Sequence, residues 1–195
     1  MFAGVMRRSV VLVLALALVG ACTQEREVAE KTDDVLKDNH ELTAMYEQDQ
    51  QDRSHAEINW AGVSERDSER RERVQEMLQA HEVRTSEDYR HAAMIFQHGT
   101  DEHSALAAHD LAQRSVKLDS TNTASKWLVA ASWDRYQMRI GEPQWYGTQF
   151  VKDTPNDSWR LYDIDTTQVT DTERQRLGVR TLAEARARVE KLNQR

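Results

Sequence analysis

Apolar positions divide the chain into one uninterrupted apolar run near the N-terminus and a series of shorter periodic stretches after it. The run extends over eleven uncharged residues from Ser9 to Val19 and follows Arg7 and Arg8. A membrane-spanning helix needs about 20 apolar residues, so this run is short for a permanent span. A basic flank before a short apolar segment is typical of a secretory leader, and we predict a signal peptide over residues 1–21.

Residues 22–40 are polar and lack apolar periodicity, which predicts a flexible tether before a domain over residues 41–195. Leu42, Met45 and Tyr46 hint at a first helix, but the run 47–53 that follows is fully polar. Further on, Val74, Met77 and Leu78 have helical spacing and predict an amphipathic helix over residues 67–81.

Three helices are expected in the central region. Thr85 begins the first, which ends before Gly99, and the next two are predicted over residues 103–118 and 124–140. In the second of these, Leu106, Ala107, Leu111, Ala112 and Val116 are expected to face inward. Small residues recur on the expected packing faces, namely Ala92, Ala93, Ala107, Ala108, Ala112, Ala130 and Ala131. This texture fits tetratricopeptide-like helical pairs, although no clean 34-residue repeat is present, and a compact bundle is the alternative.

The C-terminal third has a different pattern. Residues 144–151 and 159–164 are rich in aromatic and β-branched side chains, and the turn-forming run 154–157 separates them, which predicts one small β-hairpin near residues 144–164. Thr170 with Glu173, and Thr181 with Glu184, have the spacing of capping boxes and predict two short C-terminal helices. The predicted fold class is therefore mainly α with one hairpin.

The residues around Cys22 resemble the lipobox of bacterial lipoproteins, in which an aliphatic residue and two small residues precede a cysteine; here these are Val19, Gly20 and Ala21. The resemblance implies cleavage before Cys22, lipid on its sulfur and on the new amino terminus, and attachment to a membrane. Thr23 follows the cysteine, and in enterobacterial lipoproteins a residue other than Asp there implies the outer membrane. The alternative is an ordinary signal peptide cut after Ala21. We favour lipidation because Cys22 stands at the one position that lipidation requires.

Composition limits the possible partners and cofactors. The 195-residue chain has a formal net charge of −7, and loss of the leader would remove two arginines and leave it more acidic. An acidic domain is a poor ligand for nucleic acid, so no nucleic-acid partner is expected. Cys22 is the only cysteine, so its acylation would leave no thiol for a disulfide or a cysteine-based metal site.

Several sequence blocks resemble the bacterial domain-of-unknown-function family numbered 6624. Its members look like A-A-x-I-F-Q-H-G, W-L-x-A-x-x-D-R and P-Q-x-Y-G-T-Q. These correspond here to residues 92–99, to residues 127–135 with one extra residue before the Asp, and to residues 143–149. An upstream D-Q-x-D-R corresponds to residues 49–53, and an arginine-leucine-glycine element to residues 176–178. The resemblance spans roughly residues 49–192 and implies a candidate site but no activity.

The polar members of these blocks are the candidate binding residues: Gln97, His98, Asp134, Arg135, Gln144, Tyr146, Thr148 and Gln149. An arginine suits a carboxylate or phosphate, and histidine or tyrosine can act as acid or base. The competing interpretation is that these groups stabilise the junction between the last long helix and the hairpin. No nucleophile–base pair with a recognisable spacing identifies a catalytic residue.

Metal and cofactor motifs are weak. His91, His98, Asp101, His103 and His109 cluster in sequence, but they do not form an H-E-x-x-H pattern. We expect neither a metal nor another cofactor. The acidic residues Asp33, Asp34, Glu65, Asp67 and Glu69 are interpreted as solvated helix faces.

These patterns favour a lipid-anchored, periplasm-facing module that binds an envelope protein or a peptide, with the outer membrane as the expected location. One alternative is an enzyme with a polar cleft around Arg135, His98, Tyr146 and Gln149, whose side chains should then converge on one pocket. Another is a structural or immunity-type lipoprotein of the cell envelope.

Overall fold

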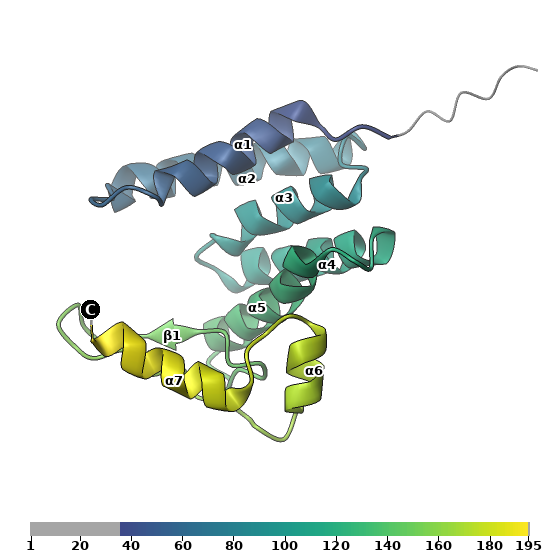
Figure 1. Ribbon diagram of the computed structural model, residues 1–195. Helices are drawn as coiled ribbons and strands as arrows, with labels where there is room; N and C mark the ends of the chain where they lie inside the picture. Colours follow the sequence, from purple (N-terminus) through teal and green to yellow (C-terminus); the bar gives the residue numbers. More distant parts are fainter. Residues whose placement is uncertain (1–35, 195) are drawn as a thin grey trace, which may run out of the picture. The chain divides into compact units, whose positions relative to one another are not determined.

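The computed structural model describes residues 36–194, which form a mainly helical domain with one small antiparallel sheet (Figure 1). The predicted fold class is thus confirmed. The predicted leader, Cys22 and most of the predicted tether lie outside the described residues. Among the residues that are described, no helix is long and apolar enough to cross a membrane.

Two helices form the N-terminal layer. Helix α1 spans His40–Asp52, and Asn39 caps it by accepting the Leu42 N–H; helix α2 spans Trp60–Gln79 behind the cap residue Asn59. The helix suggested at Leu42–Tyr46 therefore continues through the polar run that follows. Helix α2 also begins seven residues before the predicted residue 67, because its first turns carry few apolar positions that a periodicity could reveal.

The three central helices match their predictions closely. Helix α3 spans Ser86–Gln97 behind a capping box of Thr85 and Asp88, α4 spans Glu102–Leu118, and α5 spans Thr123–Arg139. Asp101 and Asn122 cap the last two by accepting backbone N–H groups, as expected for short polar side chains at this position.

The helices stack in layers. Helix α1 contacts α2 and α3, and α3 in turn contacts α4 and α5, so that neighbours along the chain are neighbours in space (Figure 1). This order supports the helical-pair alternative rather than a closed bundle. Its core combines larger side chains with fully buried alanines, namely Leu42, Met77, Leu128, Ala92, Ala93, Ala112, Ala130 and Ala131.

One inward-facing prediction was wrong. Leu106 is 36% exposed, whereas Ala105 and Ala108 of the same helix are buried. Helix α4 packs between α3 and α5, and close approach of helices selects small side chains at the contact. The larger leucine is therefore rotated towards solvent.

The C-terminal part contains the predicted hairpin and the two short helices. Strand β1 (Phe150–Val151) pairs antiparallel with β2 (Arg160–Leu161), and Gln144 forms an isolated parallel bridge with Ile164. Helices α6 (Asp171–Arg176) and α7 (Leu182–Asn193) both begin with the capping boxes expected from the sequence.

Candidate functional site

Asp134 of α5 is fully buried and holds the loop that precedes the hairpin. Its carboxylate accepts the backbone N–H groups of Trp145 (2.8 Å), Tyr146 (2.8 Å) and Thr148 (2.9 Å), and the Thr148 hydroxyl (2.7 Å). Burial raises the pKa of Asp134, and these hydrogen bonds oppose the rise. Gly147 has a φ of 83°, which suits a residue without a side chain and lets the loop curl around the carboxylate. Asp134 and Thr148 therefore act together within the fold.

The three predicted glutamines are buried and bonded within the protein. Gln144 donates to the backbone carbonyls of Gln149 (3.0 Å) and Tyr162 (2.8 Å), while its Oε1 accepts the Gln149 N–H. Gln149 and Gln97 each donate to the carbonyl of Ala131, at 3.1 Å and 3.2 Å. The amide donors satisfy backbone carbonyls at the junction of α3, α5 and the hairpin, whereas the buried Oε1 of Gln97 has no partner within residues 36–194.

An arginine that the sequence did not single out completes this junction. Arg174 of α6 is buried and donates to the carbonyls of Tyr146 (3.1 Å) and Trp145 (2.9 Å), and it pairs with Asp171. Tyr146 itself is half-buried, and burial raises the pKa of its phenol. The sequence carries no motif that distinguishes Arg174 from the exposed arginines around it.

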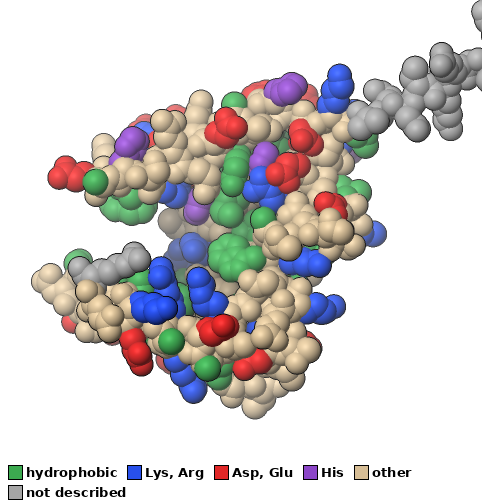
Figure 2. All heavy atoms as spheres, in the orientation of Figure 1, with side chains coloured by type: hydrophobic (Ala, Val, Ile, Leu, Met, Phe, Trp, Pro, Cys, Tyr) green, Lys and Arg blue, Asp and Glu red, His purple; other side chains and the backbone are tan. Residues whose placement is uncertain are grey.

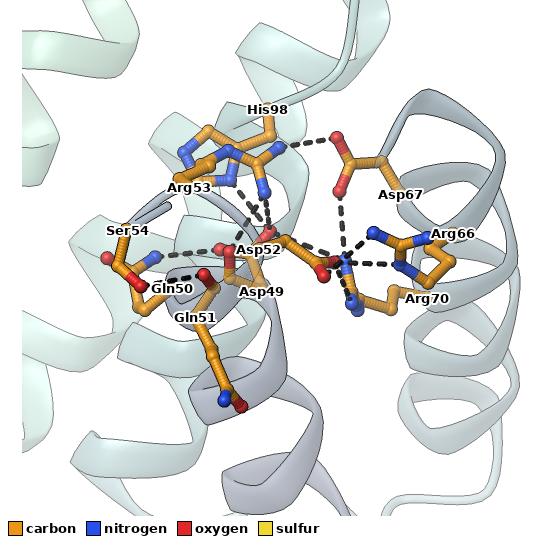
Figure 3. Close-up of polar contacts among 10 residues, drawn as sticks. All are labelled: Asp49, Gln50, Gln51, Asp52, Arg53, Ser54, Arg66, Asp67, Arg70 and His98. Carbon is orange, nitrogen blue, oxygen red and sulfur yellow. Dashed lines mark hydrogen bonds and ion pairs between the residues drawn. The ribbon is translucent and has the colours of Figure 1, made fainter. Parts of the chain in front are cut away.

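A second set of polar residues links α1 to α2, and we call it the charge cluster: Asp49, Asp52, Arg53, Arg66, Asp67 and Arg70 (Figure 3). Arg53 donates to Asp49 at 2.9 Å and also to Asp67. The hydrogen bond from Arg66 is the largest cause that lowers the pKa of Asp52 to about 2, and Arg70 adds to it. Because three carboxylates face three guanidinium groups, the cluster is balanced in charge.

His98 extends this cluster towards α3. It lies at the C-cap of α3, and its Nδ1 is 2.9 Å from Oδ1 of the buried Asp49. An ionised carboxylate only accepts hydrogen bonds, so Nδ1 donates here. Nε2 is then the ring nitrogen left for other partners. The interpretation of Asp67 as part of a solvated face was wrong, since Asp67 is buried between Arg53 and Arg70.

The charge cluster and His98 border an open cavity of about 420 Å³. Its lining comes from the C-terminal end of α1, the first part of α2, the loop after α3, and α5. The lining residues are Arg53, Trp60, Val63, Ser64, Asp67, Arg71, His98, Thr100 and Arg135. Figure 2 shows a hollow between the α1–α2 layer and the C-terminal part, with Lys and Arg side chains at its back and lower edge. Of the predicted site residues, His98 and Arg135 meet in this lining, whereas Tyr146 and Gln149 are not part of it.

Arg135 has an unusual environment for an arginine. It is half-buried, its Nε is fully shielded from solvent, and that Nε has no hydrogen-bond acceptor. Burial, together with the positive charges of Arg139 and Arg53, lowers the pKa of Arg135 to about 10. Within residues 36–194, no carboxylate therefore compensates the charge of Arg135.

The blocks that resemble a known family thus contribute to two neighbouring parts of the structure, and the block at residues 127–135 belongs to both. The blocks at residues 49–53, 92–99 and 127–135 supply Arg53, His98 and Arg135 to the cavity, whereas the block at residues 143–149 closes on Asp134. Within residues 36–194, no three histidine or acidic side chains are placed to hold a metal ion. Comparison of the chain with protein-family models, curated proteins and solved structures finds no match.

Proposed function

We propose that the protein is a lipid-anchored binding module of the bacterial envelope, attached through Cys22 to the outer membrane and facing the periplasm. Its partner would be an envelope protein or a peptide that enters the cavity at Arg135. The leader and the lipobox-like residues support the location, and the resemblance to the family numbered 6624 remains a prediction from sequence blocks.

The observation that carries the proposal is the lining of the cavity. Trp60 is 63% exposed at the start of α2, although a large aromatic side chain gains free energy by burial. It stands beside Val63 and three arginines of the same lining. Tryptophan and arginine are the residue types that most often dominate binding energy at protein interfaces.

Site-directed photocrosslinking in living cells tests this function. A photoreactive amino acid at Ser64, which lines the cavity, should give a defined adduct in the full-length protein. The matched control is the same amino acid at Leu118, which is 56% exposed at the C-terminal end of α4. An adduct at Ser64 but not at Leu118 supports the proposal; equal labelling at both, or none at Ser64, rejects a partner in the cavity.

The anchor is tested separately. Native protein should incorporate labelled palmitate and remain with the membrane fraction, and Cys22→Ser should lose both properties. Stable anchoring needs more than one acyl chain, so partial lipidation would give weaker retention. A Cys22→Ser protein that still sediments with membranes would argue against the lipid anchor.

A second candidate function is acid–base catalysis, which the Asp49–His98 contact favours. A carboxylate that holds one imidazole nitrogen orients the other towards a substrate, and this is a recurrent arrangement in catalytic sites. If the Asp49–His98 pair is catalytic, native protein should consume a compound from an envelope extract, whereas His98→Gln should not. Mass spectrometry of the extract before and after incubation measures this. Equal composition after both incubations would reject this candidate.

A further inference from the structure

We propose that the cavity binds an organic anion whose carboxylate or phosphate group is held by the guanidinium of Arg135. This inference deepens the proposed function, because it assigns a ligand chemistry to the same cavity. The two possible anionic groups share one recognition chemistry, since planar guanidinium groups donate paired hydrogen bonds to either.

The first argument is the contrast between Arg135 and three other arginines that are withdrawn from solvent. Arg53 pairs with Asp49 and Asp67, Arg70 pairs with Asp52 and Asp67, and Arg174 pairs with Asp171. Arg135 has no such partner within residues 36–194, and its buried Nε has no acceptor. A guanidinium withdrawn from solvent without a carboxylate partner is costly, and Arg135 lines the open cavity, so an anion bound there would supply the missing negative charge.

The second argument is the charge of the lining. It contains Arg53, Arg71 and Arg135 but a single carboxylate, that of Asp67. Both oxygens of Asp67 already accept hydrogen bonds, one from Arg53 and one from Arg70. Because Arg53 and Asp67 belong to the balanced charge cluster, Arg71 and Arg135 leave the wall of the cavity positive, although the whole chain has a net charge of −7.

The surroundings extend this positive field. Residues 171–194 contain six basic and four acidic side chains. Figure 2 shows Lys and Arg side chains along the lower edge of the hollow, over the C-terminal part of the chain. A cleft lined by one sign of charge concentrates ligands of the opposite sign.

The volume of the cavity and its remaining lining indicate that the anion carries an organic group. A volume of about 420 Å³ lies within the range of small-molecule sites and far exceeds the roughly 30 Å³ of a water molecule. Trp60 and Val63 offer apolar surface, and the hydroxyls of Ser64 and Thr100 and Nε2 of His98 offer further polar contacts. A free inorganic ion would use only the arginines.

Binding of matched probes to the full-length protein tests the inference. The carboxylate probe is N-acetylphenylalanine, with its neutral amide as the control ligand, and the phosphate probe is phenyl phosphate, with inorganic phosphate as its control. Calorimetry should detect one charged aromatic probe and not the neutral amide, and the Arg135 Nε–H resonance should shift on binding. The probe that binds more tightly identifies the anionic group.

Variants then locate the site. Arg135→Met should weaken binding by about 10- to 100-fold, the usual loss for a hydrogen bond to a charged group. It should fold, because Arg135 leaves no partner unpaired when it is removed. Arg84→Met deletes the same charge from an exposed position just before α3, at the end of the helix opposite His98. It should change affinity less than about twofold.

Each outcome separates this inference from the proposed function. If neither charged probe binds or shifts the Arg135 resonance, or if both arginine variants bind equally well, the inference is overturned. A photocrosslinked partner at Ser64 would then still support the binding module. If a charged probe binds but Ser64 gives no adduct, the cavity is a small-molecule site and the protein partner is rejected.

Discussion

Nδ1 of His98 lies 2.9 Å from Oδ1 of Asp49, across 49 positions of sequence, and this contact joins the last turn of α1 to the end of α3. Asp49 is fully buried, and the same oxygen accepts a hydrogen bond from Arg53. The pair thus connects the charge cluster to the wall of the cavity. Because Nδ1 is engaged, Nε2 is the His98 ring nitrogen that is available to the cavity.

The Asp49 carboxylate accepts hydrogen bonds from Gln50, Arg53 and His98. We expect Asp49→Asn to lower the free energy of unfolding by about 1–3 kcal/mol, because the amide can no longer accept from all three. Arg53 keeps Asp67 as a partner, which limits the loss. Denaturant unfolding followed by circular dichroism measures the change. Asp110→Asn, at an exposed position of α4 with no side-chain hydrogen bond, is the control and should have almost no effect. Equal stability of both variants would mean that the buried contact contributes nothing.

Asp134→Asn should be more damaging, because the buried carboxylate has four donors and an amide presents only one oxygen. Two donors would lose their acceptor, at a cost of about 3 kcal/mol. Hydrogen exchange should show the local cause: the amides of Trp145 and Tyr146, which share one oxygen, or the amide of Thr148, which is bonded to the other, should exchange faster. Thr148→Val removes the hydroxyl, which donates to Asp134 and accepts from Gln149, and should cost about 1 kcal/mol. Unchanged exchange at these amides in Asp134→Asn would contradict the anchoring role.

The elements that could be predicted are those with local signals. Thr85, Thr170 and Thr181 each begin a helix as the capping pattern indicated, because such caps depend only on residues three positions apart. The hairpin was confirmed for the same reason, since turn residues separate its two strands. These features need no knowledge of distant contacts.

The charge cluster could not be predicted, because its energy depends on pairing between helices. Asp49, Asp67 and Arg70 are buried, yet in the sequence they look like solvated positions. Hydrophobic periodicity detects only apolar inward faces, so α1 and α2 were predicted too short. Similarly, Gln144 and Asp134 were noticed as candidate site residues, and their local sequence does not reveal that the acceptors and donors they meet are backbone groups.

Gly99 should tolerate no side chain. A Cβ at this position would overlap the side chain of Ser104 at the start of α4, so the turn that presents His98 would have to shift. We expect Gly99→Ala to destabilise the protein by about 1–3 kcal/mol. Gly62→Ala is the matched control, since a Cβ there meets only movable side-chain ends at 3.3 Å within α2, and it should stabilise by up to about 1 kcal/mol. Thermal unfolding of the two variants should therefore shift in opposite directions.

His91 should make stability depend on pH. It is buried in α3, stacks on Tyr46 with ring centroids 4.2 Å apart, and has no partner for Nδ1. Burial lowers the pKa of His91 from 6.5 to about 4, and the neighbouring charge of Arg90 adds to the effect. The folded state thus binds this proton less readily than the unfolded state. Its contribution is fully present above pH 6.5 and is lost as pH falls from 6.5 to 4.

The loss attributable to His91 should reach at most about 3 kcal/mol at pH 4, since each pKa unit corresponds to about 1.4 kcal/mol. His91→Phe keeps a ring against Tyr46 but cannot be protonated, so its unfolding free energy should fall less steeply between pH 6.5 and 4. His103→Gln removes a histidine whose side chain is 88% exposed and should keep the native slope. Urea titrations at several pH values in this interval compare the three proteins. Parallel curves for native protein and His91→Phe would show that burial does not hold this histidine neutral.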